Sequence, residues 1–166
     1  SQRSYRRSQG LPCRASLPWY RENVAAILDR LAAETDARVL VLDIPMLGED
    51  LSSEWNLRVG THNAALRDIC AERGVPCLPL HDRLASMLPV GHQPPPYTGD
   101  RTPIVRAVLS HTVLRRSWDD ISRRNGLTVL TDHLHLNDRA AAAVTDLVEE
   151  ALMRGWCPPG SAPRGA

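Results

Sequence analysis

Apolar residues recur at helical spacing in the first long periodic segment of the chain. The positions i, i+3, i+4 and i+7 are held by Val24, Ile27, Leu28 and Leu31. Charged side chains occupy the opposite side, so the pattern predicts an amphipathic helix over residues 19–34. A similar segment predicts a helix over residues 55–73, closed by Gly74, a residue that commonly ends helices.

Two short apolar runs flank the second predicted helix. Residues 38–44 are rich in Val and Leu and end at Pro45, and residues 75–80 form another run that contains Pro76 and Pro79. A helix between two apolar strands makes a βαβ unit, whose right-handed crossover makes the strands parallel. The sequence therefore predicts the α/β class, with Val39–Ile44 and Cys77–Leu80 as neighbouring parallel strands.

The rest of the chain alternates irregular and helical patterns. Residues 90–100 hold three consecutive prolines, which predicts an irregular excursion over the surface. Residues 102–125 predict one or two helices, 127–130 a short strand or an extended approach, and 131–137 a loop. An Ala-rich helix follows over residues 138–154, capped by Asn137 or Asp138. Residues 1–18 and 155–166 are polar or rich in Pro and Gly, so we expect disorder in both segments.

Composition narrows the class of protein. The 166 residues suit one domain, and 43% hydrophobic with 23% charged residues is typical of a soluble protein. The net charge of +1 offers no global excess for nucleic acid or an anionic membrane. Apolar stretches are too short for a membrane span and the start shows no signal pattern, so we expect a cytoplasmic rather than a secreted protein. The cysteines show no C-x-x-C spacing and are expected to be reduced thiols: Cys13, Cys70, Cys77 and Cys157.

The loop 131–137 carries the most specific chemical pattern. Asp132 stands three residues before His135, in a loop that leads into a helix. Such a turn can fold the carboxylate back onto the imidazole, where it fixes the tautomer and leaves the second ring nitrogen free to accept a proton. This arrangement is the base half of a serine hydrolase site.

The same residues resemble the last conserved block of the SGNH/GDSL hydrolases, which reads here Asp132-His-Leu-His-Leu-Asn-Asp138. The resemblance covers residues 19–154. Four earlier stretches agree with it, namely residues 20–24, 39–48, 63–67 and 72–75. The resemblance implies an incomplete copy of a three-layer α/β/α, flavodoxin-like fold with a parallel sheet. It also implies a carboxylic-ester hydrolase with a Ser-Asp-His triad, a small-molecule ester substrate and no cofactor or metal. Asp132 and His135 would be its catalytic residues.

The family's earlier blocks are not found in this sequence. Neither a Gly-Asp-Ser stretch for the nucleophile nor a Gly-x-Asn-Asp stretch for an oxyanion donor occurs, and Gly99-Asp100 is followed by Arg101. The family's second block also supplies a glycine whose backbone N–H is an oxyanion donor. We expect the chain to begin after all three blocks and therefore to be inactive by itself. Six serines lie outside any Gly-x-Ser-x-Gly elbow and are interpreted as caps or surface hydroxyls: Ser52, Ser53, Ser86, Ser110, Ser117 and Ser122.

Alternative functions remain open at this point. The chain could be a non-catalytic remnant or fragment, or a binding module that kept half of the fold. A weaker alternative is a metal-dependent hydrolase built on His133 and His135, with a further ligand from His62, His81, Asp82, His92 or His111. The basic stretch from Arg115–Arg116 to Arg123–Arg124 could bind phosphate, but its spacing favours one solvated helix face. The acyl group, the alcohol and the oligomeric state are left open.

Overall fold

The computed structural model describes residues 16–153, which are mostly helical with one very small parallel sheet. The α/β character is therefore marginal. The elements are α2 (Leu17–Glu34), β1 (Val41–Leu42), α3 (Glu54–Glu72), β2 (Cys77–Leu78), α4 (Leu80–Ala85), α5 (Thr102–Thr112), α6 (Trp118–Arg124) and α7 (Asp138–Met153). Disorder was predicted for residues 1–18 and 155–166, and residues 1–15 and 155–166 lie outside the described residues, as do Cys13 and Cys157. For residues 16–18 the prediction is wrong, because Ser16 caps α2 and Leu17 and Pro18 belong to its first turn.

The two predicted helices of the first half are present with slightly different starts. Helix α2 begins at Leu17, earlier than predicted, because the Ser16 side chain accepts a hydrogen bond from the backbone N–H of Trp19 and Pro18 fits the first turn. Ser53 caps α3 in the same way. Gly74 follows the end of α3 with φ +63°, so the predicted glycine stop is confirmed.

The parallel pairing of the two strands is confirmed, but the strands are much shorter than predicted. Their register is Val41 with Cys77 and Leu42 with Leu78. Beyond this pair, Ile44 donates to the side chain of Asn63 at 2.8 Å and accepts from it at 2.9 Å, so its backbone groups are unavailable to a strand. Pro76 and Pro79 lack an N–H, which limits the ladder on the other side.

The small sheet separates two apolar clusters. Val41 and Cys77 belong to the cluster formed by α2 and α3, which is centred on Leu28, Leu66, Ile69 and Cys70. Leu42 and Leu78 pack instead against the cluster of α4, α7 and the segment 127–130. The alternation of the strand side chains therefore places helices on both faces of the sheet. Helix α4 was not predicted, because Leu80 had been assigned to the second strand.

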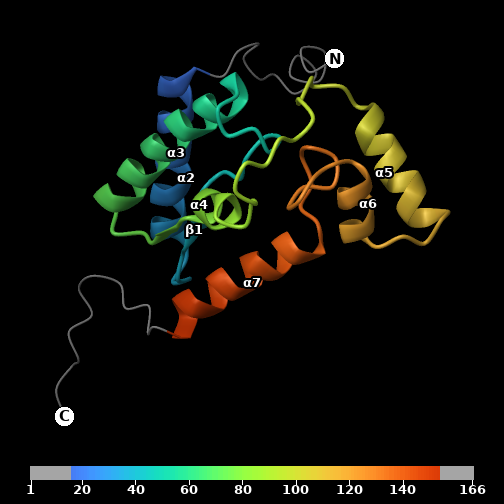
Figure 1. Cartoon of the computed structure of the whole chain (residues 1–166). Coiled ribbons are helices and arrows are strands. Elements are labelled where there is room, and N and C mark those ends of the chain that lie inside the picture. The colour runs from blue at the N-terminus through green and yellow to red at the C-terminus, as the bar shows by residue number, and fades with distance from the viewer. Residues whose placement is uncertain (1–15, 154–166) are drawn as a thin grey trace.

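Helices α5 and α6 form a pair that lies away from α2 and α3 (Figure 1). Two helices, α5 and α6, occupy the range predicted for one or two, and Gly126 follows them with φ +69°. Arg115 and Arg116 lie in the link between these helices, where Arg115 has φ +50°. The prediction of one solvated helix face for the arginines is therefore wrong. Residues 92–100 are irregular, as predicted. No helix among residues 16–153 is long and apolar enough to cross a membrane.

The carboxylate of Glu49 ties the loop after β1 to the segment before the site loop. It accepts hydrogen bonds from the backbone N–H groups of Thr128, Val129 and Leu130 at 2.7–2.8 Å. His92 contacts the same carboxylate through Nε2 at 2.6 Å, and the Glu49 side chain is fully buried. Residues 127–130 are thus an extended approach rather than a strand, with one antiparallel bridge from Leu130 to Leu136.

We predict that Glu49→Ala strongly destabilises the protein. The substitution leaves three backbone N–H groups of the segment 128–130 without their acceptor, and two of their residues are fully buried. The free energy of unfolding is expected to fall by about 3 kcal/mol or more. Urea unfolding followed by circular dichroism measures the change.

Glu54→Ala is the matched control, because Glu54 is exposed and pairs with Arg58 on the surface of α3. Its loss should be about 1 kcal/mol or less. Equal effects of the two substitutions would show that Glu49 is not a structural tie.

Candidate functional site

The loop 131–137 is closed by its own backbone. Leu130 and Leu136 form the antiparallel bridge at its base, and the N–H of Thr131 donates to the carbonyl of His135 at 2.7 Å. The loop therefore leaves the buried segment 127–130 and returns within a few residues. This tight course brings Asp132 and His135 to the same side.

Asp132 folds the turn that presents His135. Its Oδ1 accepts hydrogen bonds from the backbone N–H groups of Leu134 at 3.1 Å and His135 at 3.0 Å. The Nδ1 atom of His135 lies 2.9 Å from Oδ2 and 3.1 Å from Oδ1. The predicted hydrogen-bond contact between the two side chains is confirmed.

The two side chains differ sharply in exposure. The Asp132 side chain is 3% exposed and the His135 side chain 66% exposed. Because Nδ1 faces the buried carboxylate, the ring presents Nε2 as its free nitrogen, and no described hydrogen bond engages it. A neutral imidazole held in this way can accept a proton at Nε2 while Asp132 stabilises the resulting cation.

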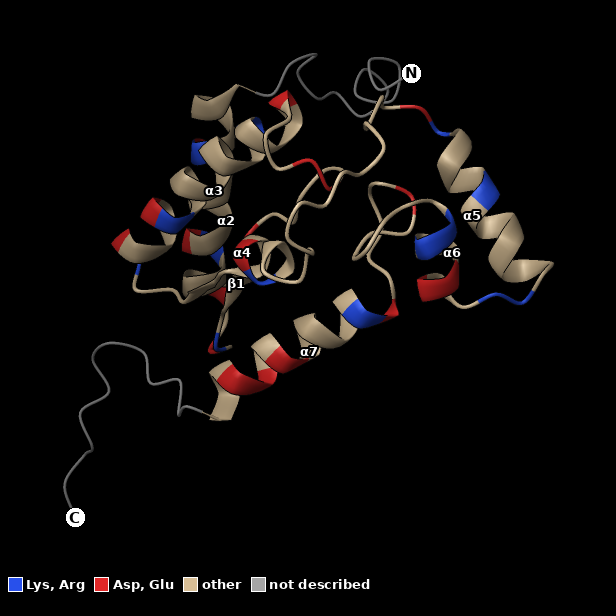
Figure 2. Cartoon of the chain, viewed as in Figure 1, with Lys and Arg blue, Asp and Glu red and all other residues tan. Residues whose placement is uncertain are grey.

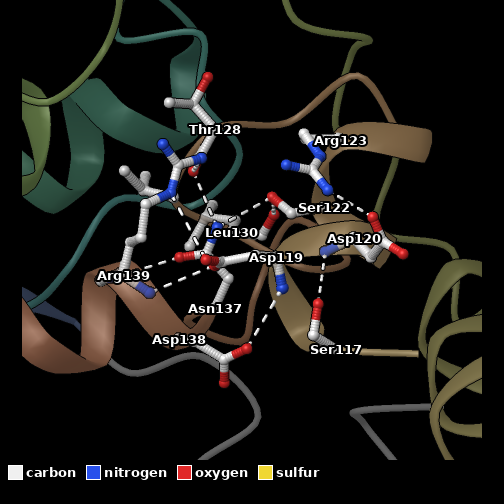
Figure 3. Close-up of polar contacts among 12 residues, drawn as sticks. Ser117, Asp119, Asp120, Ser122, Arg123, Thr128, Leu130, Asn137, Asp138 and Arg139 are labelled. Atoms are coloured by element: carbon white, nitrogen blue, oxygen red, sulfur yellow. Dashed lines mark hydrogen bonds and ion pairs between the residues drawn. The ribbon is translucent and has the colours of Figure 1, made fainter. Parts of the chain in front are cut away.

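Buried polar side chains hold the loop from the side of α6 and α7 (Figure 3). Asn137 donates through Nδ2 to Ser122 Oγ at 3.1 Å and to the carbonyl of Thr128 at 2.8 Å. Its Oδ1 accepts from the N–H of Ala140, so Asn137 is the residue that caps α7. Ser122 Oγ donates in turn to the carbonyl of Leu130 at 2.7 Å. The start of α7 and the end of the extended segment are therefore fixed together.

His133 lies in the same loop but in a different environment. It has φ +75°, and its carbonyl accepts from the N–H of Gly48 at 2.8 Å. Its ring stacks on Tyr97 with 5.8 Å between centroids, and its buried Nδ1 has no partner. Burial lowers the pKa of His133 below its ordinary value, since desolvation disfavours the charged ring more than Glu49 and Asp132 favour it.

Gly48 permits this close approach. It has φ +67°, and a Cβ at this position would come within 2.8 Å of Tyr97 Cβ. A larger residue would therefore push Tyr97 away from His133. In the sequence, the glycine that follows Pro-Met-Leu is the only sign of this close approach between Gly48 and Tyr97.

An apolar cavity of about 240 Å³ adjoins His135. Helices α5 and α6 supply one wall and the site loop the other; the lining residues are Ile104, Val108, Trp118, Thr131, Asp132, His135 and Leu136. Trp118 is braced by His111, whose ring stacks on it with 3.9 Å between centroids. Sequence reasoning missed this wall, because the pattern of residues 102–125 does not show which face meets the loop.

No described serine is hydrogen-bonded to His135. Ser53 and Ser117 cap helices, Ser122 is buried, and Ser52 and Ser86 bond to nearby chain atoms. The interpretation as caps or surface hydroxyls is confirmed for Ser53 and Ser117, which are caps, but is wrong for Ser122, which is fully buried. Ser110 lines a separate cavity.

The histidines proposed for a metal site are not brought together. His133 is buried against Tyr97, whereas the neighbouring His135 is exposed. The other candidates have separate contacts: His62 with Tyr20, His81 with Asp82, His92 with Glu49 and His111 with Trp118. Within residues 16–153, no three His, Cys, Asp or Glu side chains form a group able to hold a metal ion. Cys70 and Cys77 are free thiols whose pKa values are raised by burial, that of Cys77 to about 12.

A search against models of protein families finds no match to this chain, and a search of curated proteins finds none either. The interpretation of the site therefore depends on its geometry and on the resemblance of the loop sequence.

We predict that neutral His135 carries its proton on Nδ1. The two carboxylate oxygens of Asp132 accept only from a protonated Nδ1, so this tautomer is favoured by the contact. Nitrogen-15 NMR of the ring distinguishes the two tautomers. In Asp132→Asn the Nδ1–H tautomer should lose population, whereas His133→Asn should leave it unchanged. A wild-type ring protonated on Nε2 would contradict the assignment.

We predict that His133 titrates below its ordinary value of 6.5. In the pH range between 6.5 and the lowered pKa, the unfolded chain binds this proton and the folded chain does not. The contribution of His133 therefore makes the free energy of unfolding fall as pH is lowered through that range. Proton NMR titration of the ring gives the midpoint, and a midpoint at or above 6.5 would refute the prediction. His133→Asn, which suits a positive φ, should flatten the pH dependence of stability.

Proposed function

We propose that this chain carries the base half of a carboxylic-ester hydrolase of the SGNH/GDSL type. His135 is the general base and acid, and Asp132 orients it. The observation that carries the proposal is the contact of 2.9 Å between His135 Nδ1 and the buried Asp132 carboxylate, in a loop whose sequence resembles the family's last block. The nucleophile of this proposal is a serine in a Gly-Asp-Ser segment, which the 166 residues do not contain.

The proposed reaction uses the free ring nitrogen of His135. Nε2 takes the proton of the serine hydroxyl as its oxygen attacks the ester carbonyl, and Asp132 stabilises the imidazolium that forms. The ring then gives this proton to the leaving alcohol, and an acyl-enzyme remains. Water repeats the sequence, with His135 as base, and releases the acid. Each proton removed is returned, so the pair is unchanged after a turnover.

The fold proposal follows from the arrangement of the small sheet. Helices α2 and α3 cover one face, and α4 and α7 the other, which is compatible with part of a three-layer α/β/α sandwich. Within the described part of the chain β1 pairs with β2 alone. We propose that the remaining strands of a parallel sheet, with the nucleophile block, would continue from β1.

The cavity beside His135 suggests the class of substrate. Ile104, Val108 and Trp118 give it an apolar wall, and its volume of about 240 Å³ suits a short acyl or alkyl group. An ester with a small apolar group could place its carbonyl near His135 with that group against the wall. We therefore propose short-chain esters as substrates.

The absence of a described serine on His135 favours a second candidate, a non-catalytic remnant. Both candidates predict the same turn, because its backbone hydrogen bonds to Asp132 do not depend on activity. The presence of turnover in a protein that has the nucleophile separates them.

We predict no nitrophenyl-ester turnover above a buffer blank for this chain alone. The same chain joined to the sequence that precedes it in its gene should hydrolyse nitrophenyl butyrate. In that longer protein His135→Ala should lower kcat by about 100-fold or more, the usual contribution of a general base. Initial rates at saturating ester measure kcat.

His133→Asn in the longer protein is the matched control, since it changes a histidine of the same loop that does not contact Asp132 through its ring. It should cost much less than His135→Ala. Turnover by this chain alone that survives His135→Ala would overturn the mechanism. An inactive longer protein that contains Gly-Asp-Ser would favour the remnant.

A further inference from the structure

A second cavity lies on the helical pair α5–α6 and has a different character. It has a volume of about 310 Å³ and is lined by three arginines from three segments: Arg106 of α5, Arg116 of the link and Arg124 of α6. Ser110 and Asn125 add polar groups, and no carboxylate lines it. Figure 2 shows the corresponding basic stretches on α5, in the link and at the end of α6.

The three guanidinium groups are not neutralised by close ion pairs. Among the described residues, none of the three has an acidic partner within 4.0 Å, whereas the neighbouring Arg123 is paired with Asp120. The pKa of Asp120 lies below its ordinary value, first because Arg123 donates to it and also because of the charges of Arg124 and Arg116. Three like charges around one cavity repel one another, and an anion in the cavity would relieve that repulsion.

The link that carries Arg116 is held in place. The ring of His111 contacts the carbonyl of Arg116 through Nδ1 at 2.8 Å and stacks on Trp118. The N–H of Arg116 donates to the carbonyl of Ser110 at 3.4 Å. The backbone of Arg116 is therefore held relative to both helices before a ligand arrives, so binding needs to order only its side chain.

We propose that this cavity binds a phosphoryl group carried on a small molecule. Guanidinium groups match phosphoryl oxygens with paired N–H donors, and a phosphoryl group offers three such oxygens and up to two charges. A carboxylate has only two oxygens and one negative charge, so it would leave part of the charge and of the N–H donors of three arginines without a partner. The cavity lies at the lower end of small-ligand volumes, roughly 300 Å³. The net charge of +1 for the whole chain speaks against a polymeric phosphate backbone.

This site is separate from the proposed esterase site and does not rest on it. Ala107 and Ile121 line the arginine cavity, while Val108 and Trp118 line the cavity beside His135. The two cavities therefore share the helices α5 and α6 as a common wall. Binding to one can be measured without turnover at the other.

Isothermal titration calorimetry with phenyl phosphate at low ionic strength tests the proposal. Arg106→Gln and Arg124→Gln should each weaken binding by about tenfold or more, the loss expected for one charge-assisted hydrogen bond. Arg115→Gln is the matched control, because it makes the same change of side chain and charge at an exposed residue of the same helical pair that does not line the cavity. Its dissociation constant should stay within about twofold of wild type, since the lost charge is solvent-exposed and therefore screened, and its residue does not line the cavity.

Inorganic phosphate and benzoate complete the experiment. Phosphate should compete with phenyl phosphate, and benzoate should bind more weakly than phenyl phosphate. Equal weakening by all three arginine substitutions would overturn the proposal in favour of a diffuse charge effect. The proposal would also be overturned if millimolar phenyl phosphate gave no heat of binding, or if benzoate bound as tightly as phenyl phosphate. Arg106 and Arg124 are exposed, and thermal unfolding of each variant checks that it is folded.

Discussion

The burial of one carboxylate organises the described part of this protein. Glu49 stands in the loop after β1 and accepts from three successive backbone N–H groups in the segment 128–130, about eighty residues further along the chain. A carboxylate buried without such donors would cost several kcal/mol. Its position therefore requires the segment 128–130 to remain extended beside it. The site loop starts at the end of that segment, so its location depends on this contact.

A second set of hydrogen bonds, between residues close in sequence, shapes the loop itself. Asn137 and Ser122 fix the start of α7 against the carbonyls of Thr128 and Leu130. Asp132 fixes the turn through two backbone N–H groups and also contacts the ring of His135. The geometry of the candidate site therefore depends on hydrogen bonds to the backbone, and the His135 ring lies exposed at the surface of the loop.

Much of the local structure followed from patterns within a short stretch of sequence. Periodicity gave α2, α3 and α7, and the apolar runs around α3 gave parallel strands. The Asp132–His135 contact was predictable because three residues separate the partners. The strand lengths were overestimated, since the side chain of Asn63 takes both backbone groups of Ile44.

Features that join distant segments were not predictable in this way. Nothing in the sequence around Glu49 indicates that its partners lie near residue 129. Nor does the sequence of α5 indicate which of its apolar residues line the cavity beside His135. The arginine cavity was also hidden, because the order of Arg116 and Arg124 resembles one continuous helix until the link with positive φ at Arg115 interrupts it. Tertiary pairing decides such features, and one sequence carries no direct record of it.

The turn at Asp132 has a consequence for how related proteins are recognised. Because two backbone N–H groups donate to Oδ1 of Asp132, the shape of the Asp-x-x-His turn does not depend on catalysis. The requirements of folding alone can therefore favour an aspartate at this position in a protein that has no catalytic serine. An Asp-x-x-His match in a sequence therefore identifies a turn geometry, and it identifies an activity only together with a nucleophile placed at the free nitrogen of the histidine.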